Sequence, residues 1–374
     1  MGLRPGTLEG VVNPMFGGFY DGKVAAITGH TGFKGSWLAF WLAELGARVH
    51  GYSLPPPTHP NLHEVLSPGS ITRQSTADIR DLPGMTRWLD ETQPDIVFHL
   101  AAQPLVRLSY QDPLDTLTSC VLGTAHVLEA IRTLGLPTRV VIVTTDKVYE
   151  NHSWPYGYRE TDALGGHDPY SASKAAAEII THAWRRSFFP AGRVTTVRAG
   201  NVIGGGDYAV DRIVPDAVRS RLESRPLQLR HPHATRPWQH VLDCLSGYLE
   251  VGARLDGSPF PEAFNFGPGP DGNRSVAELI DAFGRHWPGA WEQVGREAHL
   301  VEANLLNLAI DRACTHLGWH PVWPFARAVQ ETADWYAARH LTAESDMVDY
   351  SRSQLQRYTT DARRQGLRWA TRTP

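Results

Sequence analysis

The stretch VAAITGHTGFKGSWLAFWLAELG runs from Val24 to Gly46. It begins as an apolar run, passes through Gly29, Gly32 and Gly35, and continues with apolar residues at helical spacing. This order predicts a strand, a tight turn and a helix, which together form the first unit of a dinucleotide-binding fold. We expect Gly29 to form the turn, Gly32 to let the main chain approach a pyrophosphate, and Gly35 to let the helix pack closely on the strand. The alternative is a tight turn without a ligand.

Further apolar runs continue this alternation of strands and helices. The expected strands lie at residues 47–54, 71–77, 94–104, 138–149 and 193–202, and helical patterns separate them. The alternation over residues 23–200 predicts an α/β fold with a Rossmann-like, doubly wound parallel sheet that forms an NAD-binding domain. In such a sheet the ligands lie beyond the carboxyl ends of the strands, so the residues that follow each strand are candidates for the site.

The pattern becomes looser after residue 200, where Gly, Pro, His and Arg are frequent. We expect a smaller C-terminal substrate-binding domain over residues 201–340, with segments at about 236–266 returning to the NAD-binding domain. Residues 1–22 are interpreted as an N-terminal extension, in which Met15 is an alternative start. Residues 341–374 are interpreted as a C-terminal tail, either a peripheral helix or only partly ordered.

Composition limits the class of protein. The 374 residues are 42% hydrophobic and 20% charged, which allows a large core. The formal net charge of -3 argues against a nucleic acid or an anionic membrane as partner. No apolar run is long enough to span a bilayer, and the first residues do not have the pattern of a signal peptide. Three scattered cysteines favour a reducing cytoplasm, and the 17 histidines show no metal-ligand spacing, so no metal is expected.

The end of the second expected strand reads Tyr52, Ser53, Leu54, where dinucleotide folds usually place an acidic residue that binds the adenosine ribose. NAD and NADP are therefore not distinguished there, although the absence of Arg favours NAD. Asp78 follows the next strand and could accept a hydrogen bond from the adenine amino group. It could equally cap the following helix. The small residues Ala101 and Ala102 would let the next loop pass close to the cofactor.

Three groups of polar residues could carry chemistry. Tyr170 and Lys174 are four residues apart, so on a helix they share a face, and a nearby ammonium would lower the pKa of the phenol. Taken alone, this spacing is more typical of a solvated helix face. The second group, Thr145 to Lys147, follows an expected strand; alone it could be a turn with a surface ion pair. The third group is Asn201, Arg236 and Gln239, in which Arg236 suits a diphosphate or a loop salt bridge.

Seven motifs together resemble a known family. They read GHTGFKGSWL, AAQPLVRLSY, TTDKVY, YSASK, VRAGNVIGGGD, RPWQHVLDCLSGYL and NFGPG. They resemble the extended short-chain dehydrogenase/reductases and, among these, the family of CDP-glucose 4,6-dehydratases. The resemblance covers roughly residues 13–335. The glycine and Tyr-x-x-x-Lys motifs mark only the superfamily, whereas the Asp-Lys pair, GHTGFKGSW and RPWQHV are more specific.

The resemblance implies a mechanism with NAD as cofactor and a nucleotide-activated hexose, CDP-glucose before others, as substrate. Tyr170, assisted by Thr145, takes the proton of the 4-hydroxyl while a hydride passes from C4 to NAD⁺. Lys147 then removes the C5 proton, Asp146 protonates the departing 6-hydroxyl, and the hydride returns to C6. Related dTDP-glucose dehydratases have a glutamate where Lys147 stands, and the epimerases of the superfamily lack the acid–base pair.

The resemblance also assigns binding residues. For the cofactor these are Gly29, Thr31, Gly32, Phe33, Lys34, Asp78, Ile79, Leu100, Ala101, Ala102, Tyr170 and Lys174. For the substrate they are Gln103, Arg107, Asn201, Arg212, Arg236 and Gln239. Members of the superfamily commonly pair helices between subunits, so a homodimer or homotetramer is expected.

One position departs from the family pattern. Cys120 stands where members usually have an asparagine that supports local backbone hydrogen bonding, so a water or altered packing would have to substitute. Alternatives to dehydration of CDP-glucose are dehydration of another nucleotide sugar, 4-epimerisation of a nucleotide sugar, and a dinucleotide-binding scaffold without catalysis.

Overall fold

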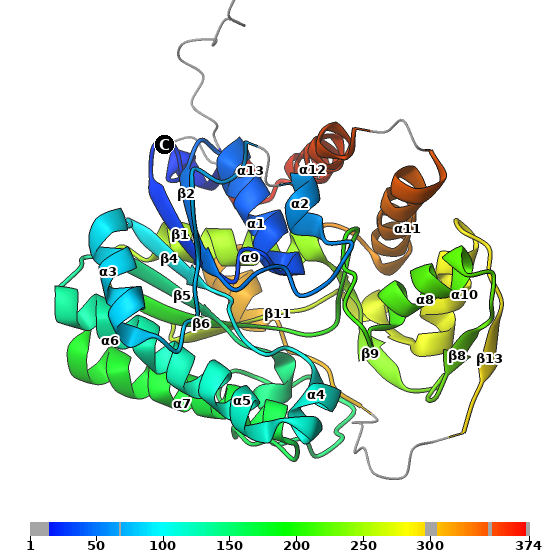
Figure 1. Cartoon of the computed structure of the whole chain (residues 1–374), viewed down its shortest axis with the longest axis horizontal. Coiled ribbons are helices and arrows are strands. Elements are labelled where there is room, and N and C mark those ends of the chain that lie inside the picture. Colours follow the sequence, from blue (N-terminus) through cyan, green and yellow to red (C-terminus); the bar gives the residue numbers. More distant parts are fainter. Residues whose placement is uncertain (1–14, 67–68, 296–304, 343–345, 372–374) are drawn as a thin grey trace, which may run out of the picture.

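A computed structural model of the chain (Figure 1) describes residues 15–66, 69–295, 305–342 and 346–371. Its centre is a seven-stranded sheet in which all neighbouring strands are parallel. In spatial order the strands are β11 (Ala263–Phe266), β6 (Val194–Ala199), β5 (Arg139–Val143), β4 (Ile96–His99), β1 (Val24–Thr28), β2 (Arg48–Ser53) and β3 (Arg73–Thr76). The order reverses at β1, which confirms the predicted doubly wound α/β fold.

Helices cover both faces of the sheet. One face carries α1 (Phe33–Glu44) and α9 (Val241–Arg254), and the other carries α3 (Leu82–Thr92), α6 (Gly123–Leu134) and α7 (Pro169–Phe188). Side chains along β1 alternate between the two resulting cores. Ala25 and Ile27 are buried with α1 and α9, whereas Ala26 is buried with α3 and α6. Both faces are covered, so the strands are apolar on both sides, as the sequence shows.

A smaller lobe extends from the carboxyl side of the sheet and is seen at the right of Figure 1. It contains α8 (Ile213–Leu222), β8 (Leu227–Leu229), β9 (Thr235–Pro237), β12 (Asn273–Ser275), α10 (Val276–Gly284) and β13 (Trp291–Gln293). Between the two parts, β7 (Val202–Ile203) pairs with β10 (Gln239–His240). The chain then returns to the sheet through α9 and β11, so residues from both parts meet beyond the strand ends.

The last helices pack on the α1 side of the molecule. They are α11 (Phe325–Leu341), α12 (Met347–Arg364) and α13 (Arg368–Thr371). The indole of Trp369 is fully buried and stacks on the ring of Phe16 with centroids 5.2 Å apart. Phe16 belongs to the short helix η1 (Met15–Gly18) within the expected extension, while residues 1–14 of that extension lie outside the described residues. The described part of the C-terminal segment thus contributes to the core, which its polar composition did not indicate.

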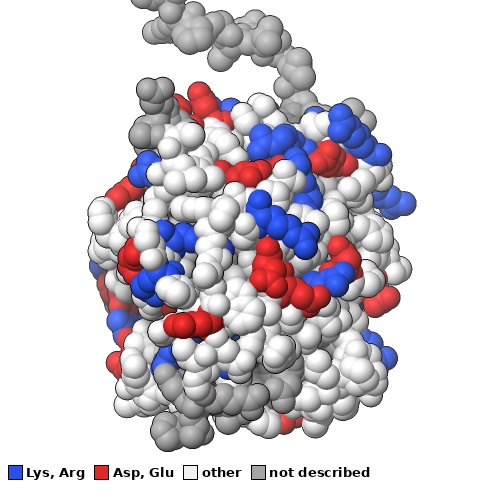
Figure 2. Space-filling view, turned by 90° about the vertical axis from the view of Figure 1, so that its right-hand side faces the viewer, with Lys and Arg blue, Asp and Glu red and all other residues white. Residues whose placement is uncertain are grey.

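The shorter elements complete the chain. They are α2 (Leu62–Leu66), α4 (Val106–Gln111), α5 (Pro113–Leu117), a π-helical turn (Thr118–Leu122), the turns Asp146–Val148 and Pro270–Gly272, and a second π-helical turn (Ala313–Leu317). On the face formed by the small lobe and the last helices, acidic and basic side chains are intermixed (Figure 2). Among the described helices, none is both long and apolar enough to cross a bilayer.

Candidate active site

The glycine loop after β1 has the geometry that the sequence predicts. Gly29 has a φ of 78°, and a Cβ there would lie 2.7 Å from the amide nitrogen of Ala101. A Cβ at Gly35 would lie 2.1 Å from the carbonyl oxygen of Gly29, so this glycine lets the helix sit directly against the turn. At Gly32 nothing lies closer than 3.4 Å, which leaves the main chain approachable. No side chain caps α1, so its first amide groups point toward this space without a side-chain acceptor.

In the region expected to hold the adenosine, the polar side chains of Ser53 and Asp78 already have hydrogen-bond partners among the described residues. At the end of β2, Ser53 shares a hydrogen bond of 2.7 Å with the hydroxyl of Thr31. Both carboxylate oxygens of Asp78 accept hydrogen bonds from Arg80, and these bonds hold the pKa of Asp78 below its ordinary value. Asp81, and not Asp78, caps α3 by accepting from Gly84, so the capping alternative for Asp78 is wrong.

The neighbouring residues of the expected cofactor site are held by the fold. The side chain of Ile79 is buried against Gly123 on α6. The amides of Leu100 and Ala101 bond to Thr28 at the end of β1, at 3.0 and 3.3 Å. The loop through Ala102 therefore passes directly beside the glycine turn. The ring of Phe33 packs near Gly204, at the junction with the smaller lobe.

Asp146 is a buried acid in the turn that follows β5. Its Oδ1 accepts a hydrogen bond of 3.0 Å from Thr145, which caps this turn. Its Oδ2 is buried and has no hydrogen-bond partner among the described residues. Burial raises the pKa of Asp146, although Lys147, Thr145 and Arg236 act in the opposite direction. A carboxyl group that keeps its proton to higher pH than usual is suited to donate that proton. Lys147 lies next to it and is partly exposed.

Tyr170 and Lys174 are both buried at the start of α7. Thr145, which caps the turn after β5, lies close enough to the phenol of Tyr170 to act on its pKa. Burial raises the pKa of Tyr170, so the expectation that a nearby ammonium lowers it is wrong for the protein alone. The ammonium of Lys174 instead donates to the carbonyl oxygen of Val143 at 3.3 Å, and burial lowers its pKa.

Cys120 lies in the π-helical turn before α6 and is fully buried. Its thiol donates to the carbonyl oxygen of Gln103 at 3.6 Å, so it supplies a weak version of the backbone support expected from asparagine. The amide of Gln103 is bonded to Thr116 at 2.8 Å and to the main chain of Leu105. This amide therefore holds the loop after β4, and its expected contact with substrate stays a prediction.

Cationic side chains lie near Asp146 and Tyr170. Lys34 interacts electrostatically with Asp146, Arg212 and Lys174, and burial lowers its pKa. Arg212 donates to Asp207 at 2.9 Å, which raises the pKa of the guanidinium, and it also faces Tyr170. These residues give the site an excess of positive charge.

The other expected substrate residues lie on α4, on β9 and β10, and between β6 and β7. Arg107 on α4 pairs with Asp211 at 3.0 Å and thus bridges to the smaller lobe. Arg236 lies on β9, close enough to Asp146 to affect its pKa. The amide nitrogen of the Gln239 side chain donates to the carbonyl oxygen of Phe266 at 2.9 Å, while its oxygen is buried without a partner among the described residues. The carbonyl oxygen of Asn201 accepts from the main chain of Gln239.

Glu178 and Arg198 form a buried ion pair that was not predicted from the sequence. Both side chains are 4% exposed, and their atoms Oε2 and Nη2 lie 2.8 Å apart. A signal was present, because Glu178 follows Lys174 by four residues and so lies on the same face of α7. Its partner on β6 gave no such signal, since the pairing depends on the tertiary structure.

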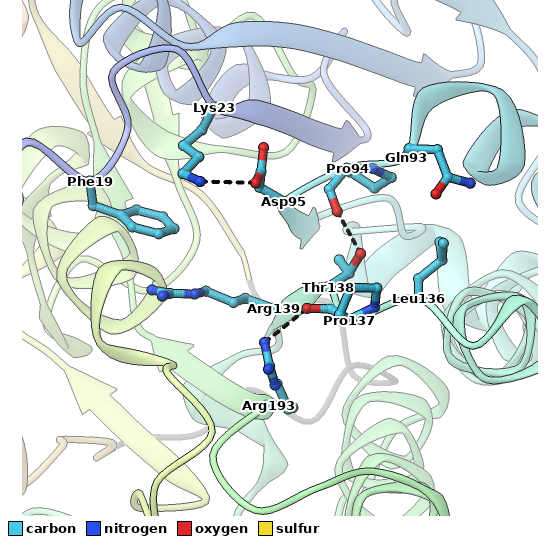
Figure 3. Close-up of a pocket in the computed structure, with 10 residues that line it drawn as sticks. All are labelled: Phe19, Lys23, Gln93, Pro94, Asp95, Leu136, Pro137, Thr138, Arg139 and Arg193. Atoms are coloured by element: carbon cyan, nitrogen blue, oxygen red, sulfur yellow. Dashed lines mark hydrogen bonds and ion pairs between the residues drawn. The ribbon is translucent and has the colours of Figure 1, made fainter.

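A pocket of about 280 Å³ opens at the amino ends of the strands, the end of the sheet away from the expected catalytic residues (Figure 3). It lies beside the amino ends of β1, β4 and β5, and Lys23, Arg139 and Arg193 line it together with Asp95. Each of these cations already has a partner: Lys23 pairs with Asp95, and the two arginines donate to main-chain carbonyl groups. The expected catalytic residues lie after the carboxyl end of β5 and at the start of α7, and none of them lines this pocket.

Fold and site together define an enzyme of the extended short-chain dehydrogenase/reductase type. Residues 25–267 match the model of the NAD dependent epimerase/dehydratase family, and the chain belongs to this family. The CDP-glucose 4,6-dehydratase of Salmonella typhimurium is 43% identical over 91% of this chain and 97% of its own length. The dTDP-glucose 4,6-dehydratase of Streptomyces antibioticus is 33% identical over 69% of this chain and 74% of its own.

Solved structures agree on the fold. DesIV, a dTDP-glucose 4,6-dehydratase from Streptomyces venezuelae solved with NAD bound, superposes with a TM-score of 0.74 at 23% identity and covers 87% of this chain and 99% of its own. The epimerase Mth375 from Methanothermobacter thermautotrophicus gives 0.73 at 25% identity, covering 87% and 96%. The cofactor of the family is NAD, and the open glycine loop and the uncapped start of α1 fit its pyrophosphate.

Proposed function

We propose that the chain is a CDP-glucose 4,6-dehydratase that converts CDP-D-glucose to CDP-4-keto-6-deoxy-D-glucose. The observation that carries this proposal is the buried Oδ2 of Asp146, which has no hydrogen-bond partner among the described residues. The other oxygen of this carboxyl group is bonded to Thr145, and Thr145 also lies close enough to the phenol of Tyr170 to act on its pKa. An acid for elimination thus lies beside a base for oxidation. The 43% identity to a CDP-glucose 4,6-dehydratase supports this substrate before other nucleotide sugars.

NAD, when bound, accepts a hydride from C4 of the sugar and returns one to C6. The residues of the chain move the protons. Tyr170 takes the proton of the 4-hydroxyl, and the nearby Thr145 opposes the rise in pKa that burial causes. The 4-ketone then acidifies the C5 proton, which Lys147 removes. Asp146 protonates the leaving 6-hydroxyl, a role that fits its raised pKa.

The same site supports binding of a nucleoside diphosphate. Lys34, Arg212 and Arg236 are cations near Asp146 or Tyr170, and guanidinium groups bind phosphate oxygens in a bidentate manner. We assign Arg107, Asn201, Arg212, Arg236 and Gln239 to substrate, and the residues of the glycine loop to NAD.

The test is to incubate the purified protein with NAD and CDP-glucose, with UDP-, dTDP- and GDP-glucose in parallel, and to follow the products by mass spectrometry. Loss of one water from CDP-glucose alone is the expected result. Loss of water from another sugar nucleotide would keep the mechanism and replace the substrate. Unchanged mass with inversion at C4, detected by NMR, would instead establish a 4-epimerase.

We also propose a homodimer or homotetramer assembled through α5, the following π-helical turn and α7. This face exposes Leu114, Leu117, Leu122 and Ile179, which are between 47% and 72% exposed. Contiguous apolar residues on a helical surface favour pairing with a second copy. Light scattering after size-exclusion chromatography should give at least twice the mass of one chain, and Leu114→Glu should shift it toward one. A monomeric wild-type protein would contradict the proposal.

We propose a cytoplasmic location for the enzyme. All three cysteines are free thiols, and Cys120 and Cys244 are buried, as is common in proteins of reducing compartments. Fractionation of the source cells, followed by detection with an antibody, tests this directly. Recovery outside the cytoplasmic fraction would contradict it.

A further inference from the structure

The buried pair of Glu178 and Arg198 lies behind the active site, and no step of the proposed mechanism uses it. Glu178 Oε1 accepts from Arg198 Nε at 2.9 Å, and Oε2 accepts from Nη2 at 2.8 Å. Although burial disfavours the charged carboxylate, pairing with Arg198 holds the pKa of Glu178 below its ordinary value. The pair is therefore charged and makes a two-point contact between α7 and β6. Two parallel hydrogen bonds fix the orientation of the two side chains relative to each other as well as the distance between them.

On one side, the pair anchors the helix of the oxidation residues. Tyr170, Lys174 and Glu178 follow one another at intervals of four residues, so they share one face of α7. Glu178 is also close enough to Lys174 to favour its charged form, against the effect of burial. Fixing Glu178 thus fixes how far α7 extends into the site and how it is rotated.

On the other side, the pair anchors the start of the turn that carries Asp146 and Lys147. The hydroxyl of Thr144 donates to Glu178 Oε1 at 2.5 Å. Thr144 is the first residue after β5, and Thr145 follows it directly. The carboxylate of Glu178 therefore contacts the chain two residues before the turn begins at Asp146.

The end of the same turn is anchored by the arginine. Arg198 Nη1 donates to the hydroxyl of Tyr149 at 2.7 Å, and Tyr149 is the first residue after the turn. That hydroxyl donates in turn to Asn265 Oδ1 on β11, also at 2.7 Å. Both ends of the turn are thus tied to one ion pair, and through it to α7.

We propose that Glu178 and Arg198 form a positioning clamp that keeps the elimination residues on the turn in register with the oxidation residues on α7. The inference rests on the proposed function, in which one bound sugar is oxidised at C4 and then loses water across C5 and C6. Tyr170 must reach C4 while Lys147 and Asp146 reach C5 and C6. A displacement of one segment by about 1 Å can cost about 100-fold in rate, so a rigid link between them has a direct catalytic purpose.

Two substitutions loosen the turn and leave the ion pair in place. Tyr149→Phe removes the hydroxyl at the end of the turn, and Thr144→Val removes the one at its start. We expect kcat to fall about tenfold or more with KM changed less than threefold, because substrate still binds but the turn is misplaced. The rate of elimination should fall more than the rate of oxidation at C4. Reduced cofactor should therefore accumulate during turnover. In the protein without cofactor or substrate, hydrogen exchange of the amides in residues 145–149 should become faster.

Tyr158→Phe is the matched control. Tyr158 is 1% exposed and stacks on Tyr149, but its hydroxyl bonds to Asn151 and to the amide of His152, away from the clamp. It should leave exchange at 145–149 and the level of reduced cofactor as in the wild type. The clamp is refuted if Tyr149→Phe and Tyr158→Phe have the same hydrogen exchange at residues 145–149 and the same level of reduced cofactor. It is also refuted if neither Tyr149→Phe nor Thr144→Val changes both of these quantities. A wild-type protein that does not dehydrate CDP-glucose would refute the proposed function, and the exchange measurement would still decide whether the turn is clamped.

Discussion

Asp146 Oδ2 faces the α-carbon of Gly200, because a Cβ added at residue 200 would come within 2.8 Å of this oxygen. The same Cβ would lie 2.9 Å from a ring carbon of Pro237. Gly200→Ala should therefore push the acid out of position without removing any reacting group. We expect kcat for dehydration to fall about tenfold or more, while NAD still binds. Steady-state kinetics and a cofactor titration measure both.

The control for this substitution is Gly284→Ala at the end of α10, where the nearest atom to the added Cβ would be 3.8 Å away. It adds the same methyl group far from the site and should leave kcat unchanged. Equal activity of Gly200→Ala and wild type would mean that the contact with Asp146 does not constrain the reaction.

Asp146→Asn and Lys147→Ala should separate the two halves of the elimination. Each should lower the rate of dehydration by about 100- to 10,000-fold, the usual contribution of a general acid or base. In deuterated water, Asp146→Asn should still exchange the C5 proton, because the proposed base is intact. Lys147→Ala should not. NMR of the recovered sugar nucleotide measures the exchange.

Tyr170→Phe tests the order of the steps. It should abolish both C5 exchange and reduction of the cofactor, since neither can occur before C4 is oxidised. If Lys147→Ala dehydrates at the wild-type rate while Tyr170→Phe does not, Lys147 is not the base.

Burial explains why parts of this site could not be predicted from the sequence. The order of strand, glycine turn and helix was predictable, because glycine alone fits where Gly29 and Gly35 meet backbone atoms. The spacing of Tyr170 and Lys174 correctly placed them on one helix face. It could not show that the lysine ammonium turns to the carbonyl oxygen of Val143, nor that desolvation of the phenol outweighs the attraction of a nearby cation.

The hydrogen-bond and ion-pair partners of polar side chains also could not be predicted from the sequence. A glutamine after a strand end looks available for substrate, but the side chain of Gln103 is bonded to Thr116 thirteen residues further along. The pairing of Glu178 with Arg198 spans α7 and β6. Such contacts depend on how elements pack, and a local pattern does not contain that information. The buried Trp369 is a similar case, because its basic and polar neighbours hid its place in the core.

Bound NAD should exchange readily with free NAD in solution. No carboxylate stands at the end of β2, the hydroxyl of Ser53 is occupied by Thr31, and the oxygens of Asp78 are engaged by Arg80. The adenosine ribose therefore lacks the charged hydrogen bond that usually holds it. Protein purified without added cofactor should be inactive and should regain activity when NAD is added. NAD that stays bound through desalting, seen by mass spectrometry, would contradict this.

Asp243 should make the stability of the protein depend on pH. Its carboxyl group is fully buried, and burial raises its pKa to about 7. In the unfolded chain an aspartate has a pKa of about 4. Between these values the folded state binds more protons, so the contribution to stability is complete below about pH 4, is lost as the pH rises, and is gone above about pH 7. The slope is at most about 1.4 kcal/mol per pH unit.

Asp243→Asn should remove this dependence, since the amide oxygen can still accept from the main chain of Val322 and from Tyr358. Urea unfolding at several pH values measures the difference between wild type and variant. We expect the wild type to lose stability relative to Asp243→Asn as the pH rises from about 5 to about 7. A difference that does not change with pH would show that the carboxyl group is not protonated in the folded protein.

Trp369 should stabilise the fold without contributing to the reaction. Its indole is fully buried, stacks on Phe16, and contacts the edges or faces of Trp41 and Tyr358 with centroids 5.9 Å away. Replacing a buried tryptophan by alanine leaves a cavity and typically costs about 3–5 kcal/mol. Trp369→Ala should therefore lower the free energy of unfolding by about that amount, measured by chemical denaturation.

The partly exposed Trp291 is the control, and its replacement by alanine should lower the free energy of unfolding clearly less. Because α13 packs beside η1 and α12 and contributes no residue to the site, KM for the sugar nucleotide should not change. A raised KM in Trp369→Ala would show that the C-terminal helices also shape the substrate site.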